Sequence, residues 1–228
     1  MNTFQSYLAS SIGKKQIVAA TGLFLILFVV GHLAGNLFMY GGPEVFNGYA
    51  DFLKKLRPAL YLIEFALSII FIVHLYVTAL LVWENCQAKG TGYAVYKPVG
   101  KRSWAARLMP YTGAVVLAFV IWHLLDFTFV DHQGPRSVMP DGRHGGLYAI
   151  VYNSFSNPLH SFLYILAMIA VGLHLAHGIE SFFQTFGFNH PRYTPMIREI
   201  SNALAMLITF AYSSIPVYVL LDSVKCFR

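Results

Sequence analysis

Residues 16–40 read QIVAATGLFLILFVVGHLAGNLFMY, an almost unbroken apolar run with one histidine, His32, in its interior. About 20 such residues are enough for a helix to cross the hydrocarbon core of a bilayer. Four further apolar runs of similar length follow, at residues 58–83, 108–130, 158–186 and 200–221. The sequence therefore predicts an all-α integral membrane protein, built as a bundle of five transmembrane helices.

The composition favours a single membrane domain over residues 1–228. Of the 228 residues, 57% are hydrophobic and only 11% are charged, whereas about a quarter of the residues in a soluble domain are charged. The first run is longer than the core of a signal peptide, about 7–15 residues, so we expect it to be retained. The net charge of +6 comes from basic residues beside the ends of the runs. Nucleic acid is therefore not an expected partner.

Basic residues beside the spans predict the orientation. Five spans place the termini on opposite sides, and cytoplasmic segments carry an excess of Lys and Arg. Residues 1–15, 84–107 and 187–199 share one side and hold nine Lys and Arg, against seven on the other side. We therefore expect a cytoplasmic N-terminus. Cys86 and Cys226 then lie on opposite faces, so neither a disulfide nor a zinc or iron–sulfur site is expected from them.

Glycine and proline clusters separate the spans, for example at residues 41–43, 134–135 and 145–146. Such clusters mark turns between helices and give no sign of a domain linker. The longest outer connection is residues 131–157, and we expect a short helix near residues 144–154.

Four different spans each contain a histidine deep in the apolar run: His32, His74, His123 and His174. An ionisable side chain in a membrane is costly and is a candidate for function. A single histidine can equally serve as a hydrogen-bonding partner between helices. The depths of the four residues are therefore needed to interpret them.

The depths sort the four histidines into two level pairs. His32 lies 17 residues beyond Lys15, and His123 lies 16 residues beyond Arg107. At about 1.5 Å per residue, both are ~25 Å from the inner side and so in the outer half of the membrane.

The depths of the other two histidines are measured from the outer side. His74 lies 17 residues beyond Arg57, and His174 lies 17 residues beyond Asn157. Both are ~25 Å from the outer side and so in the inner half, roughly 13–15 Å from the first pair for spans of about 38 Å.

Two neutral imidazoles at one depth on facing helices are the ligands that a six-coordinate b-type haem requires. The two pairs therefore predict two haems b stacked across the bilayer. Zinc or copper would need more ligands at one point, and a proton relay would not need matched depths. Small residues beside the histidines could admit a flat macrocycle or simply permit close helix packing: Gly31, Ala34, Gly35, Gly172 and Ala176.

The remaining histidines are weaker candidates. His177, one turn beyond His174, is the fallback ligand. His160 lies near the outer interface and has no partner at its own depth. The loop histidines are expected to be solvated: His132, His144 and His190.

The motifs around these histidines resemble those of a known family. Residues 31–36 read GHLAGN, residues 42–47 read GPEVFN, Trp122 precedes His123, and residues 174–182 read HLAHGIESF. Over nearly the whole chain they resemble the five-helix dihaem cytochrome b membrane anchor, of the b558 type, of succinate dehydrogenase and quinol:fumarate reductase. The resemblance implies that His32 and His123 hold a distal haem b and that His74 and His174 hold a proximal one. In the family a glycine follows the fourth-helix ligand by four residues, and Gly178 selects His174.

The resemblance also implies partners and a location. A flavoprotein subunit with FAD would carry out the succinate or fumarate chemistry, and a subunit with iron–sulfur clusters would face the proximal haem. This chain would pass electrons between that iron–sulfur subunit and menaquinone, an exchangeable substrate, within the lipid of the bacterial cytoplasmic membrane. The C-terminus would lie on the outer side, and the whole complex could form a dimer. The N-terminus and residues 84–107 are candidate docking surfaces.

Quinone reduction takes up protons, so an acid is expected beside the quinone. The acidic residues of the outer half are Glu44, Asp51, Glu64 and Asp126. Glu44 and Glu64 are the candidates for catalytic proton transfer, and helix capping or pairing with Lys54 or Arg57 is the alternative. Some relatives carry a glutamate two residues before the fourth-helix ligand, where this chain has Gly172. At the inner face, candidate partners for haem propionates are Ser10, Lys14, Lys15 and Arg107.

Two other functions fit parts of this pattern. A dihaem cytochrome b subunit of another quinone-linked oxidoreductase, such as a hydrogenase or a formate dehydrogenase, would use the same ligands. A transporter with a histidine proton relay would use buried histidines without haem.

Overall fold

A computed structural model of the chain describes residues 3–88 and 104–226. Within these ranges the chain is helical, and its only β pairing is an isolated bridge between Val138 and His144. Five of the described helical stretches are long and apolar enough to cross a membrane. The prediction of an all-α fold with five spans is confirmed.

Each span overlaps the apolar run that predicted it. The five spanning helices are α2 (Ser11–Asn36), α4 (Arg57–Ala88), α5 (Trp104–His123), α7 (Pro158–Thr185) and α8 (Thr194–Cys226). Short turns extend two of them: the 3-10 turn η1 (Leu37–Gly41) follows α2, and the π-helical turn η2 (Leu124–Thr128) follows α5. A short helix, α1 (Thr3–Ala9), precedes the first span.

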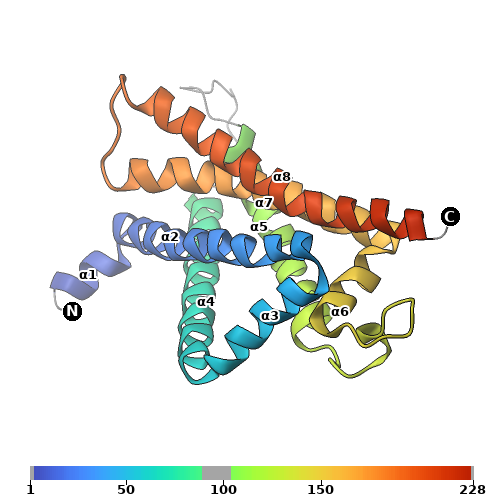
Figure 1. Cartoon of the computed structure of the whole chain (residues 1–228). Helices are drawn as coiled ribbons and strands as arrows, with labels where there is room; N and C mark the ends of the chain where they lie inside the picture. Colours follow the sequence, from blue (N-terminus) through green and yellow to red (C-terminus); the bar gives the residue numbers. More distant parts are fainter. Residues whose placement is uncertain (1–2, 89–103, 227–228) are drawn as a thin grey trace.

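The spans are arranged around α7. Helix α7 contacts α2, α5 and α8, and α4 packs on α2. In Figure 1, α2, α7 and α8 run alongside one another, whereas α4 and α5 cross them steeply in this view. The N- and C-termini lie at opposite ends of the molecule (Figure 1), as an odd number of spans requires.

Two shorter helices, α3 (Gly42–Lys55) and α6 (Gly146–Phe155), contact each other. Helix α6 confirms the short helix expected near residues 144–154, and the 3-10 turn η3 (Pro135–Ser137) lies before it. Helix α3 was missed because it is too polar to register as an apolar run and because residues 41–43 indicate a turn. Gly42 does turn the chain, with φ of 81°, but a helix follows at once.

The buried side chains form two clusters. One joins η1, α3, α6, the N-terminal part of α7 and the C-terminal part of α8: Met39, Phe46, Tyr148, Val151, Tyr152, Phe155, Tyr164, Ile215 and Val219. The other lies between α2, α7 and α8: Leu33, Ala167, Met168, Val171, Leu175, Ala205 and Ile208. By contrast, α4 leaves Leu62 71% exposed and Phe65 64% exposed. Such apolar faces suit contact with lipid.

Candidate functional site

The structure brings His32 and His123 together. His32 lies near the end of α2 and His123 is the last residue of α5. The centroids of their imidazole rings are 5.8 Å apart, and the ring planes are nearly perpendicular, at 88°. Phe28 stacks on the other side of His32, with centroids 5.4 Å apart. The two histidines predicted to share the outer level are therefore neighbours.

His74 on α4 and His174 on α7 are the two histidines predicted to share the inner level. Each is held by a threonine on a neighbouring helix. His74 Nδ1 lies 3.0 Å from Thr21 Oγ1 of α2, and His174 Nδ1 lies 3.4 Å from Thr112 Oγ1 of α5. His177, the fallback ligand, lies one turn beyond His174 on α7.

A glycine beside each threonine makes room for the imidazole. A Cβ added to Gly22 would lie 3.4 Å from His74 Cε1, and a Cβ added to Gly113 would lie 3.5 Å from His174 Cε1. The rings therefore pack directly on the backbone of α2 and α5. Neither glycine nor its threonine neighbour was expected from the sequence to take part in the site.

A spacing in the sequence could have identified these residues. Residues 21–32 read TGLFLILFVVGH and residues 112–123 read TGAVVLAFVIWH, so each outer histidine follows a Thr-Gly pair by the same interval. Eleven residues separate the threonine from the histidine in both spans, which is about three helical turns. Thr-Gly and His therefore lie on one face of their helix at two levels.

Two glycines near His32 differ in what surrounds them. A Cβ on Gly35 would collide with the ring of Tyr49, so Gly35 serves close packing. Gly31, next to His32, meets no atom of the described residues within 4 Å of such a Cβ. Open space beside a ligand histidine is compatible with a flat macrocycle.

The space beside Gly172 is filled by a side chain of the neighbouring helix α8. A Cβ at this position would collide with Thr209 Oγ1 of α8. A glutamate at this position would have no room while Thr209 remains. Glycine here therefore permits the close approach of α7 and α8.

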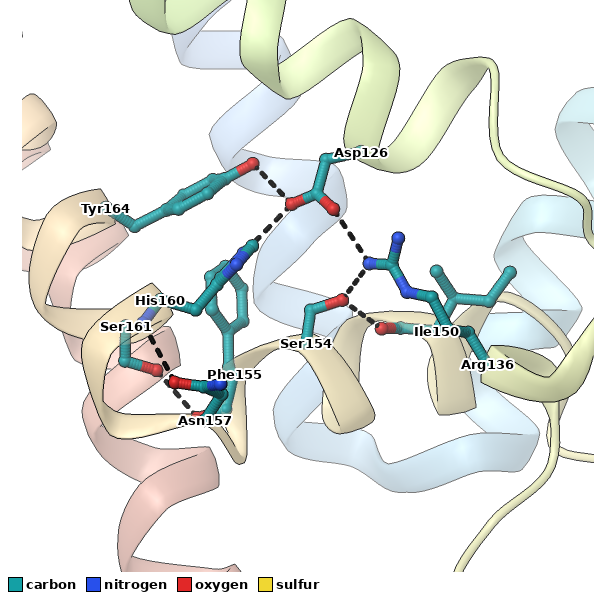
Figure 2. A network of polar contacts seen from close by, with 9 residues as sticks. All are labelled: Asp126, Arg136, Ile150, Ser154, Phe155, Asn157, His160, Ser161 and Tyr164. Carbon is teal, nitrogen blue, oxygen red and sulfur yellow. Dashed lines mark hydrogen bonds and ion pairs between the residues drawn. The ribbon is translucent and has the colours of Figure 1, made fainter.

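Asp126 is the centre of a polar network at the outer end of α5 (Figure 2). Its side chain is only 8% exposed. Oδ1 accepts a hydrogen bond from Arg136 Nη2 at 2.8 Å, and Oδ2 accepts one from the Tyr164 hydroxyl at 2.9 Å. Arg136 also donates to Ser154, whose hydroxyl donates to the Ile150 carbonyl.

His160 joins this network. Its Nε2 lies 2.9 Å from Asp126 Oδ2, at ion-pair distance but not aligned as a hydrogen bond. The His160 ring stacks on Tyr164 and meets Trp122 edge to face. These contacts give His160 a structural role between α5 and α7.

The other acids of the outer half are exposed. Glu64 pairs with Arg57 at 3.2 Å, and Asp51 pairs with Lys54 at 2.9 Å. Glu44 lies in the first turn of α3, where an acid favours the helix dipole. Within the described ranges, neither Glu44 nor Glu64 forms a hydrogen bond or ion pair with a histidine of the two groups.

At the inner face, two of the candidate propionate partners have other roles. Ser10 caps α2 by accepting a hydrogen bond from the Gly13 amide at 3.1 Å. Lys14 forms an ion pair with Glu84 that ties α2 to α4. Most of the candidate docking loop, residues 89–103, lies outside the described residues.

No three His, Cys, Asp or Glu side chains converge on one point in the described part of the chain. His32 and His123 come together as a pair, and two histidine ligands are what a six-coordinate porphyrin iron takes from a protein. The geometry of this pair therefore fits one of the haem sites expected from the sequence.

Comparison with known proteins gives one close parallel. The chain is 28% identical over 188 residues to the succinate dehydrogenase cytochrome b558 subunit of Bacillus subtilis (strain 168), and the alignment covers 82% of this chain and 84% of the relative. This similarity confirms the resemblance to b558-type anchor subunits. No family model and no solved structure matches the chain.

Proposed function

We propose that this chain is the membrane anchor and dihaem cytochrome b subunit of a succinate dehydrogenase or fumarate reductase. It passes electrons between an iron–sulfur subunit and menaquinone. The observation that carries the proposal is the contact of two deep histidines from different spans, His32 with His123; His74 and His174 are the second proposed pair. Similarity to a cytochrome b558 subunit supports it over most of the chain.

When bound, the two haems b supply one-electron transfer at two levels of the membrane. The chain itself would provide the imidazoles that hold the haems. Helices α2 and α5 carry His32 and His123, which would hold the distal haem, and α4 and α7 carry His74 and His174, which would hold the proximal haem. FAD and the iron–sulfur clusters belong to partner subunits.

The chain lies in the bacterial cytoplasmic membrane with its N-terminus in the cytoplasm and its C-terminus outside. The excess of basic residues beside the N-terminal side supports this orientation. Electrons thus cross between the cytoplasmic partners and the outer face. Glu44 and Glu64 are the proposed proton-exchanging groups for quinone, and both are exposed to an approaching molecule.

A visible spectrum of the purified membrane protein tests haem binding. We expect a reduced b-type α band, and its absence would contradict any cytochrome function and favour a transporter. The complex is then isolated through a tag on this chain. Succinate- or fumarate-dependent redox change of the haem supports the proposal, whereas co-purification with a hydrogenase or a formate dehydrogenase contradicts it.

The pairing has its own test. We expect His32→Ala and His123→Ala to lose the same haem, and His74→Ala and His174→Ala to lose the other. Redox-resolved spectra distinguish the two haems. Loss of one shared haem from His32→Ala and His74→Ala would refute the pairing.

A further inference from the structure

The hydroxyl of Thr21 hydrogen-bonds within its own helix, α2. Thr21 Oγ1 lies 2.7 Å from the Ile17 carbonyl and 3.1 Å from the Val18 carbonyl. This is the usual bond of a helical threonine to the preceding turn. A hydroxyl has a single proton, so Thr21 presents only lone pairs to the neighbouring helix.

The hydrogen bond of Thr21 within its own helix indicates which ring nitrogen of His74 carries the proton. His74 Nδ1 lies 3.0 Å from Thr21 Oγ1, and the His74 ring also hydrogen-bonds to the Val18 backbone carbonyl. Both oxygens can accept, which favours the proton on Nδ1. A neutral imidazole has one N–H. His74 Nε2 is then deprotonated, with its lone pair available to a metal.

The same arrangement recurs on α5 with longer distances. Thr112 Oγ1 donates to the carbonyls of Leu108 and Met109, at 3.1 and 3.2 Å. His174 Nδ1 lies 3.4 Å from that oxygen. The direction of the bond is the same, but its length makes it weaker.

The outer histidines lack this support. His123 Nδ1 is buried and forms no hydrogen bond with any described residue. Its helix carries Thr112 three turns away, beside His174. The threonines therefore act on the inner level only.

We propose that Thr21 and Thr112 are positioning residues of the inner haem, holding His74 and His174 as Nδ1–H tautomers whose Nε2 atoms face the iron. This inference rests on the proposed function. A hydrogen bond from the distant ring nitrogen fixes the orientation of a ligand histidine and raises its basicity. A more basic ligand stabilises the ferric over the ferrous iron and lowers the reduction potential.

Redox titration of the purified protein, followed by its visible spectrum, tests this role. The variants are Thr21→Val and Thr112→Val, which keep the shape and remove the acceptor. We expect Thr21→Val to raise the potential of the haem that His74→Ala removes. Loss of a ligand's hydrogen-bonding partner changes metal affinity by about tenfold or more, and a tenfold loss that falls on the ferric form alone raises the potential by ~59 mV for one electron. Thr112→Val should shift the same haem by less.

Two controls separate positioning from folding. Thr21→Ser restores the acceptor and should restore the wild-type potential. Thr209→Val removes a threonine of α8 that bonds to its own helix, Oγ1 to Ala205 carbonyl at 2.8 Å, and should leave both potentials unchanged. An unchanged outer haem in each variant shows that the protein remains folded.

The outcomes are distinct. If the wild type shows two haems and Thr21→Val leaves the inner potential unchanged, the positioning role is refuted while the proposed function stands. The same holds if Thr21→Ser shifts the potential as much as Thr21→Val does. Selective loss of the inner haem from Thr21→Val, with retention in Thr21→Ser, supports the role. A wild type without a b-type band refutes the proposed function itself.

Discussion

His160 of α7 and Asp126 at the end of α5 approach within 2.9 Å, Nε2 to Oδ2. Asp126 also accepts hydrogen bonds from Tyr164 and Arg136, so one nearly buried carboxylate joins α5, α7 and the outer loop. Because a buried charge is costly without partners, these donors hold the outer end of α5 in place, one turn beyond His123.

Asp126→Asn should destabilise the protein. The amide keeps the shape but loses the charge that Arg136 and His160 face, and hydrogen bonds to charged groups contribute about 1.5–3 kcal/mol. We expect a loss of that size, measured as a lower midpoint of thermal unfolding in detergent. Glu64→Gln is the control, because Glu64 and Arg57 are 55% and 51% exposed and such pairs contribute less than ~1 kcal/mol. Equal midpoints for the two variants would contradict a structural role for Asp126.

Asn47→Ala should loosen the outer cap formed by α3 and α6. Asn47 Nδ2 donates to the Gly145 carbonyl at 2.8 Å, and its Oδ1 accepts from the Tyr148 amide at 3.0 Å. Losing both leaves backbone groups without partners, at a cost of about 1–3 kcal/mol. Asn202, exposed on α8, is the matched control. Faster proteolysis or hydrogen exchange of residues 131–157 in the Asn47 variant alone is the expected result.

Gly172→Ala should weaken the contact between α7 and α8. The new methyl group would collide with Thr209 Oγ1, and overpacking of this kind costs about 1–3 kcal/mol. Gly48→Ala on α3, where a Cβ meets no described atom within 4 Å, should be neutral or slightly stabilising because alanine favours helix. Thermal unfolding compares the two.

Thr209→Ala should partly rescue Gly172→Ala, since it removes the colliding oxygen. A double variant no more stable than Gly172→Ala alone would show that another contact limits this position.

His174→Ala should lose the inner haem, whereas His177→Ala should keep both. The reason is that Thr112 and Gly113 face the His174 ring. Pyridine haemochrome content per protein provides the measurement. The opposite result would make His177 the ligand.

The sequence by itself determined the five spans and predicted the levels of the four deep histidines, of which the structure brings His32 and His123 together. Both follow from local properties, because hydropathy marks a span and the constant rise of a helix converts residue number into depth. Helix α3 was missed for the same reason, since its polar residues form no apolar run.

Only the tertiary structure decided which side chains support those histidines. Thr21 and His74 are 53 residues apart in the chain, and Thr112 and His174 are 62 apart. Whether the space beside Gly172 is open to a macrocycle or filled by Thr209 likewise depends on how α8 lies against α7. These contacts depend on how the helices pack on one another, which the periodicity of a single helix does not specify.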